Sequence, residues 1–149
     1  MEHPHRSRIP IDSLVFGYVP MLPFVAAALG VWLLPAPWPA IAVWLVVIWG
    51  GLILCFVGGV RRGYGFGNDR ASTPAEIATM LVYFCLAGFA LFLPWPRLAL
   101  LVLAAGFVIA AALDTHAARR GNAPAHFAKL RPPQFSIAVV SLLVIALAV

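Results

Sequence analysis

Charged side chains are scarce in this sequence, and the shortage limits what the protein can be. Lys, Arg, Asp and Glu make up 10% of the 149 residues, whereas 63% of the residues are hydrophobic. A soluble domain carries about 25% charged and about 45–50% apolar residues. The chain therefore has too little polar surface to be soluble, and the sequence indicates an integral membrane protein. Because few side chains remain for catalysis, we expect a protein that is not an enzyme.

Metal-binding and redox residues are also few. The cysteines Cys55 and Cys85 form no C-x-x-C pair, and no spacing of Cys and His is typical of a zinc site. The 4 histidines lie outside the apolar stretches, so none is placed to ligate a haem held between membrane helices. We therefore expect no cofactor and no bound metal.

What the sequence does contain is a set of long apolar stretches. A helix needs about 20 residues to cross a hydrocarbon core of roughly 30 Å. The predicted fold class is all-α: a polytopic membrane protein with one transmembrane domain over residues 14–149, preceded by a basic cytoplasmic tail over residues 1–13. Five transmembrane helices are predicted, over residues 14–34, 38–60, 74–93, 96–120 and 132–149.

Prolines mark two of these helices. Pro132 and Pro133 suit a first helical turn, so the fifth helix is predicted to begin there. Pro20 and Pro23 lie inside the first helix, where they remove backbone hydrogen bonds and predict a kink. Such a kink is either a hinge or a packing corner, and the sequence leaves both open.

The positive charges predict the orientation of the helices. Lys and Arg near helix ends are retained on the cytoplasmic side of a membrane. With five spans, only Arg97 of the 10 basic residues falls on the outer face. We therefore expect an N-inside, C-outside, multi-pass protein of the bacterial inner (plasma) membrane. The basic residues on the inner face are Arg6, Arg8, Arg61, Arg62, Arg70, Arg119, Arg120, Lys129 and Arg131.

Basic residues at the inner helix ends are expected to contact anionic lipid headgroups, at about 1 kcal/mol each. Asp114 lies where the fourth helix leaves the bilayer, within reach of these cations. An interfacial ion pair that holds the loops together is the preferred interpretation of Asp114, and a headgroup or substrate contact is the alternative. Since the membrane accounts for the positive charge, no nucleic-acid partner is expected. The basic residues in question are Arg61, Arg62, Arg119, Arg120 and Arg131.

Glu76 lies inside the third predicted helix, where a carboxylate is costly and often functional. It ends a Thr-Pro-Ala-Glu pattern that begins at Thr73 and is typical of a capping box. We therefore interpret Thr73 and Glu76 as a helix cap, with a proton or ion site as the alternative.

Small residues line one face of the second predicted helix. Gly51, Cys55 and Gly59 recur at every fourth position, and Gly58 broadens the strip. This spacing lets two membrane helices approach closely. Packing within the monomer is the preferred interpretation, and a face for a second copy or another membrane protein is the alternative.

Two segments carry a resemblance to a known family. They are Phe56-Val-Gly-Gly-Val-Arg61 followed by Gly63, and the run from Leu113-Asp114 through Pro124-Ala-His-Phe127 to Leu130-Arg131. Both are similar to segments of the proteins related to transmembrane protein 69, small multi-helix membrane proteins of bacteria and mitochondria. The resemblance implies an inner-membrane location and a domain of unknown function. Arg62 and His126-Phe127 depart from the family pattern, which favours aromatic residues there.

Two functions of different classes follow. The leading hypothesis is a non-catalytic accessory or assembly component of a larger inner-membrane complex. The alternative is a small transporter, lipid-handling protein or channel, which predicts a polar cavity lined by Tyr18, Thr79, Tyr83 or Ser141. A membrane enzyme is third, and it requires the carboxylates and histidines near the inner surface to converge.

Overall fold

The computed structural model describes residues 9–67 and 73–149 of the chain, and the described part contains helices but no strand. It is an all-α bundle with five stretches that are long and apolar enough to cross a membrane. The predicted fold class and number of spans are therefore confirmed, and the chain is a multi-pass membrane protein. The elements are α1 (Ile11–Tyr18), a 3₁₀ turn η1 (Val19–Met21), α2 (Leu22–Leu33), α3 (Trp38–Tyr64), α4 (Thr73–Phe92), α5 (Pro96–Arg119) and α6 (Phe127–Ala146).

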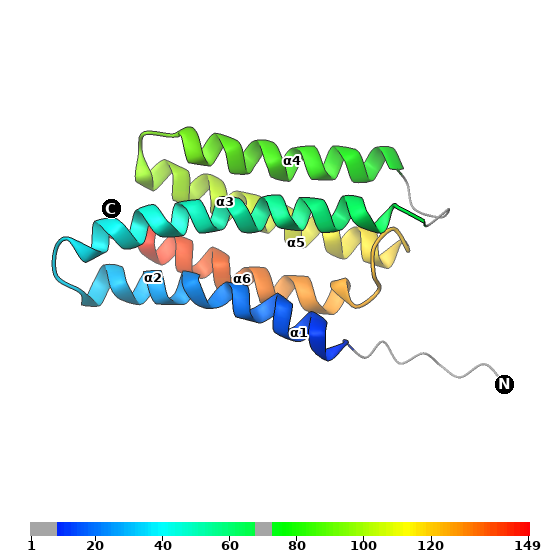
Figure 1. The fold of residues 1–149 in the computed structure, drawn as a ribbon, viewed down its shortest axis with the longest axis horizontal. Helices are drawn as coiled ribbons and strands as arrows, with labels where there is room; N and C mark the ends of the chain where they lie inside the picture. Colours follow the sequence, from blue (N-terminus) through cyan, green and yellow to red (C-terminus); the bar gives the residue numbers. More distant parts are fainter. Residues whose placement is uncertain (1–8, 68–72) are drawn as a thin grey trace.

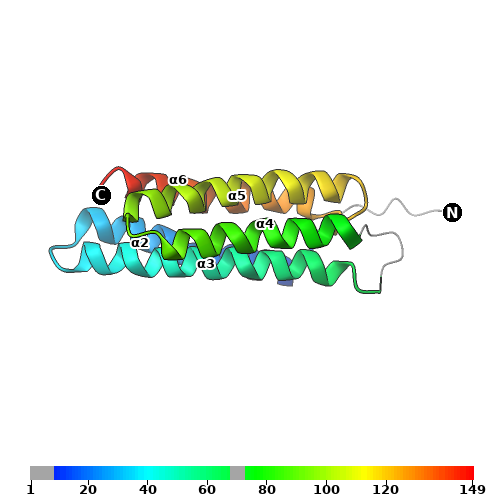
Figure 2. The same ribbon diagram turned by 90° about the horizontal axis from the view of Figure 1, so that it is seen from above.

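The five spans lie roughly along one common axis, and successive spans run in opposite directions (Figures 1 and 2). α1, η1 and α2 together make the first span, so α1 begins and α6 ends at opposite ends of the bundle (Figure 1). α3 packs against α2, α4 and α5, while α5 packs against α3, α4 and α6. α6 packs against α5 and α2, and α3, α5 and α6 carry most of the buried residues in the described part of the chain.

The middle of the bundle is apolar and fully buried. The ring of Phe107 on α5 lies between two other rings, with centroids 5.4 Å from Phe24 on α2 and 5.5 Å from Phe135 on α6. Leu54 of α3 and Leu103 of α5 complete this layer without measurable exposure. The core thus joins four helices through side chains that lack polar groups.

The first span is interrupted where the prolines predict a kink. Pro20 lies in η1, and Pro23 lies in the first turn of α2. The indole Nε1 of Trp49 on α3 donates a hydrogen bond of 2.9 Å to the carbonyl oxygen of Pro20. This bond fixes the break against the bundle, and α1 continues from it at an angle, beside α6 (Figure 1).

The last span begins earlier than the sequence predicts. α6 starts at Phe127, so Pro132 and Pro133 lie in its second turn and not in its first. The prediction at Pro132 was wrong because Phe127, Leu130 and Arg131 belong to the same buried face as the residues after the prolines. Packing of this face on α5 outweighs the two backbone hydrogen bonds that the prolines cannot donate. α3 is likewise longer than predicted and carries its arginine pair inside the helix.

The small residues of α3 do not all serve one interface. A Cβ on Gly51 would touch the side chain of Leu91 at 3.1 Å, and one on Gly58 would lie 3.4 Å from the backbone oxygen of Met80. These two glycines therefore pack against α4. Cys55 is half-buried, and a Cβ on Gly59 would meet nothing within 4 Å.

Candidate functional site

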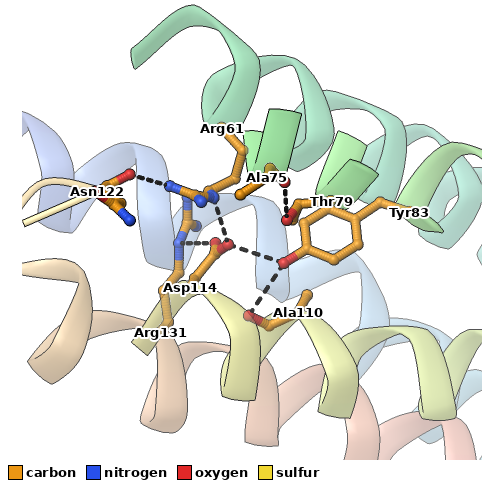
Figure 3. Close-up of polar contacts among 8 residues, drawn as sticks. All are labelled: Arg61, Ala75, Thr79, Tyr83, Ala110, Asp114, Asn122 and Arg131. Carbon is orange, nitrogen blue, oxygen red and sulfur yellow. Dashed lines mark hydrogen bonds and ion pairs between the residues drawn. The ribbon is translucent and has the colours of Figure 1, made fainter. Parts of the chain in front are cut away.

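Asp114 is the centre of a buried polar cluster at the end of the bundle where α5 finishes. It falls on the inward face of α5 because it follows the buried Phe107 and Ala110 at helical spacing, and its side chain has no exposed surface. Its Oδ1 lies 3.4 Å from Nε of Arg61 on α3, and its Oδ2 lies 3.2 Å from Nε of Arg131 on α6 (Figure 3). The ion pair expected for Asp114 is therefore present, and it is buried.

Tyr83 brings a fourth helix to this cluster. It is fully buried on α4, and its hydroxyl donates a hydrogen bond of 2.9 Å to Oδ1 of Asp114 (Figure 3). The same hydroxyl lies 3.5 Å from the carbonyl oxygen of Ala110, one turn earlier on α5. Helices α3, α4, α5 and α6 thus meet through one carboxylate.

Each arginine has further partners that hold its guanidinium group in place. Nη1 of Arg61 donates to the carbonyl oxygen of Asn122 at 2.6 Å, which ties α3 to the connection between α5 and α6. Nη1 of Arg131 donates to Oε1 of Gln134 at 3.0 Å. The guanidinium carbon of Arg131 also lies 4.2 Å from the ring centre of Phe127 and 5.0 Å from that of Phe135. Such cation–π contacts stabilise a cation that has left water.

The charges of the cluster do not balance. Arg61 and Arg131 are only 2% and 6% exposed, and they share the single carboxylate of Asp114. Within residues 9–67 and 73–149, neither arginine forms an ion pair with a second acidic side chain. Burying an ion costs several kcal/mol unless it is well paired. The cluster therefore holds an excess positive charge, partly compensated by carbonyl oxygens and aromatic rings.

Glu76 and Arg62 form a separate contact at the same end of the bundle. Nη1 of Arg62 lies 3.9 Å from Oε2 of Glu76, and the guanidinium carbon lies 4.3 Å from the ring centre of Phe66. The carboxyl group of Glu76 is fully buried against Gly65, where an added Cβ would collide with it. The side chain of Thr73 lies outside the described residues, so the capping box stays a prediction.

The other basic residues predicted at the inner helix ends have different surroundings. Arg119 and Arg120 are exposed at the end of α5, where contact with lipid headgroups stays a prediction. Arg61 and Arg131 belong to the buried cluster instead. Residues 1–8 of the predicted basic tail and Arg70 lie outside the described residues, and residues 11–13 of that tail belong to α1.

His126 lies just before α6, outside the predicted spans. Its ring packs edge-on against the ring of Phe127, and the two ring centroids are 5.1 Å apart. Partial burial lowers the pKa of His126 below the usual 6.5, the positive charge of Arg131 lowers it further, and the charge of Asp12 acts in the opposite direction. Among the described residues, no group of three or more His, Cys, Asp or Glu side chains is placed to hold a metal ion.

Sequence reasoning named Arg61 and Arg131 as possible partners of Asp114 but missed two features of the cluster. Tyr83 was expected only as the lining of a cavity, and Arg131 was expected at the membrane surface and not buried inside a helix. A sequence signal for Arg131 exists, because Phe127, Arg131, Gln134 and Ala138 follow helical spacing across the prolines. No comparable signal marks Tyr83, whose partner lies 31 positions away in the sequence.

Comparison with known proteins gives one finding. The model of a family described as a protein of unknown function, DUF3429, matches residues 9–148. No curated protein and no solved structure matches the chain.

Proposed function

We infer a role for this chain from the premise that it belongs to the DUF3429 family, a membrane-protein family without an assigned activity. The role is that of a non-catalytic accessory or assembly component that packs against a larger membrane complex. The resemblance to transmembrane protein 69 is part of the same proposal. So is the location, an inner membrane of bacterial type with the N-terminus inside.

The observation that carries this proposal is the outward face of α3. Gly59 and Gly63 are exposed, and a Cβ on either would meet nothing within 4 Å. Cys55, four residues before Gly59, is half-buried beside them. Small residues at this spacing let a second helix approach closely, and packing of this kind drives association in lipid. The occupant that fits is a transmembrane helix of another protein.

The charge pattern supports the proposed orientation. The last turns of α3 and α5 and the first turns of α6, which carry basic residues, lie at the end of the bundle where α1 begins (Figure 1). The first turn of α5, which contains Arg97, lies at the other end. A cytoplasmic location of the basic end, where α1 begins, agrees with the retention of Lys and Arg on the cytoplasmic side of a membrane.

A transporter or channel receives less support from the same structure. Tyr83 is enclosed by the cluster, and the Thr79 hydroxyl donates to the carbonyl oxygen of Ala75 in its own helix. Ser141 lines a groove between α2 and α6 whose other lining residues include Val25, Leu29 and Val140. Tyr83, Thr79 and Ser141, which were expected to line one polar cavity, therefore lie in three different environments.

The test is site-specific photo-crosslinking in native membranes, with the photoreactive residue placed at Gly63 in the full-length chain. We expect one crosslinked protein neighbour, and we expect Gly59→Leu to abolish the crosslink because the added side chain blocks close approach. Gly88→Leu on α4 is the matched control, since a Cβ there also meets nothing within 4 Å, and it should leave the crosslink intact.

Two results would overturn the proposal. Crosslinks to lipid alone would mean that the face of α3 has no protein partner. Crosslinks only between copies of this chain would replace the accessory role by self-association.

A further inference from the structure

The cluster around Asp114 borders a cavity, because Arg131 lines it. The ion pairs that join the helices do not account for this cavity. The cavity has a volume of about 120 Å³ and lies between α1, α3 and α6. Arg131 and Phe127 of α6 line one side, Ser13 and Phe16 of α1 line another, and Phe56 of α3 lines the third. A water molecule takes up about 30 Å³ in the liquid, so the space admits a group of several heavy atoms.

The break at Pro20 leaves room for this cavity. α1 packs on α6 through Gly17, where a Cβ would lie 3.4 Å from Leu130. α1 therefore follows α6 and stays apart from α3 at this end of the bundle (Figure 1). Phe16 and Phe56 flank the cavity with 74% and 64% of their surface exposed. In a membrane these two rings face lipid, so the cavity borders the bilayer and not only the aqueous phase.

The charge of the lining is positive and incompletely compensated. Arg131 shares Asp114 with Arg61, and it is the charged residue that lines the cavity. Asp12, the carboxylate of α1, is exposed and does not line it. An anion in the cavity would supply the second negative charge that the two arginines lack. Arginine is suited to this task because its guanidinium group binds phosphate oxygens through charge-assisted hydrogen bonds.

We propose that this cavity binds the phosphate group of an anionic phospholipid, with Arg131 as the cation, the Ser13 hydroxyl as a second polar contact, and the acyl chains leaving between Phe16 and Phe56. The occupant is a lipid because two exposed aromatic rings, those of Phe16 and Phe56, line the cavity. The site is distinct from Arg119 and Arg120, which are exposed at the end of α5 and do not line this cavity.

The test uses native mass spectrometry of the purified full-length protein in mild detergent. The probes are phosphatidylglycerol, phosphatidylcholine with the same acyl chains, and inorganic phosphate. We expect one tightly bound phosphatidylglycerol, weaker binding of phosphatidylcholine, and no displacement of phosphatidylglycerol by an excess of inorganic phosphate. Efficient displacement by inorganic phosphate would overturn the proposal in favour of a soluble anion.

Three variants locate the bound lipid. Arg131→Gln should weaken phosphatidylglycerol binding about tenfold or more, since it removes charged hydrogen bonds. Ser13→Leu fills the cavity without touching the ion cluster and should weaken binding to a similar degree with the melting temperature unchanged. Arg120→Gln removes the same charge from an exposed position and should have little effect.

The variants also decide against the proposal. An equal loss in Arg120→Gln would show that binding depends on overall surface charge. If Arg131→Gln does not fold, Ser13→Leu decides, and unchanged binding in that variant would refute the site.

Discussion

The carboxylate of Asp114 forms ion pairs with two guanidinium groups and accepts a hydrogen bond from a phenol. Among the residues that the structure describes, it is the one acidic group paired with these two buried arginines. Removing one partner of a buried ion pair is more damaging than replacing the whole pair, because the remaining charge stays in the interior without a counter-charge. At this position the remaining charges are two arginines. Substitutions at Asp114 and Tyr83 should therefore differ in severity.

Asp114→Asn should lower the free energy of unfolding by about 3–5 kcal/mol, as expected for a buried pair that loses one partner. Tyr83→Phe keeps the ring and removes only the hydroxyl, so about 1.5–3 kcal/mol should be lost with a hydrogen bond to a charged group. Both are measured by denaturant unfolding in mild detergent. Asp12→Asn, at an exposed position, is the control, and a loss at Asp114 no larger than at Asp12 would contradict the assignment.

His126 makes stability depend on pH. Because burial and Arg131 lower the pKa of His126 in the folded protein, the unfolded chain binds the proton at a higher pH than the folded chain. The stability that neutral His126 contributes is therefore fully present above the usual pKa of 6.5. It is lost as the pH falls from that value through the lower pKa of His126 in the folded protein.

The measurement is the melting temperature between pH 8 and pH 5 in wild type and in His126→Gln. Below about pH 6.5, the ordinary pKa of histidine, the melting temperature of the wild type should fall more steeply than that of His126→Gln. Parallel curves would show that other groups cause the acid sensitivity.

At the scale of elements, neighbouring glycines of α3 have opposite surroundings. Gly58 faces the backbone of Met80 on α4, whereas Gly59 faces outward. Gly58→Leu should force α3 and α4 apart and lower the free energy of unfolding by about 1–3 kcal/mol, the usual effect of overpacking. Gly59→Leu should leave the stability of the isolated protein unchanged. Denaturant unfolding of the two variants side by side is the test, and equal losses would mean that Gly59 is also packed.

The helices themselves were predictable because long apolar runs leave few alternatives in a membrane. Their ends were less predictable, as α3 and α6 show. Counting apolar residues ends the second predicted helix just before Arg61 and begins the fifth just after Arg131. Both arginines are nevertheless helical and buried, Arg61 in α3 and Arg131 in α6. Asp114 was expected to pair with basic residues at the membrane interface, but a single sequence does not reveal that the pair is buried and that both arginines lie within helices.

For the whole molecule, an odd number of spans places the two ends of the chain on opposite sides of the membrane. A phosphatase reporter that is active only outside the cytoplasm should be active after Val149 and inactive before Met1. The opposite pattern would invert the proposed orientation, and activity at both ends or at neither would contradict five spans. The sequence predicts this topology because the basic residues fall on alternate connections.

The bond from Arg61 to the carbonyl oxygen of Asn122 has a consequence for biogenesis. A ribosome delivers α3 to the membrane well before it has made Asp114 or Asn122, so the newly inserted Arg61 has neither of its later partners. It is expected to remain hydrated at the bilayer surface until the hairpin of α5 and α6 arrives. A nascent chain arrested before α5 should therefore leave Arg61 open to a water-soluble arginine reagent, and completion of the hairpin should withdraw it.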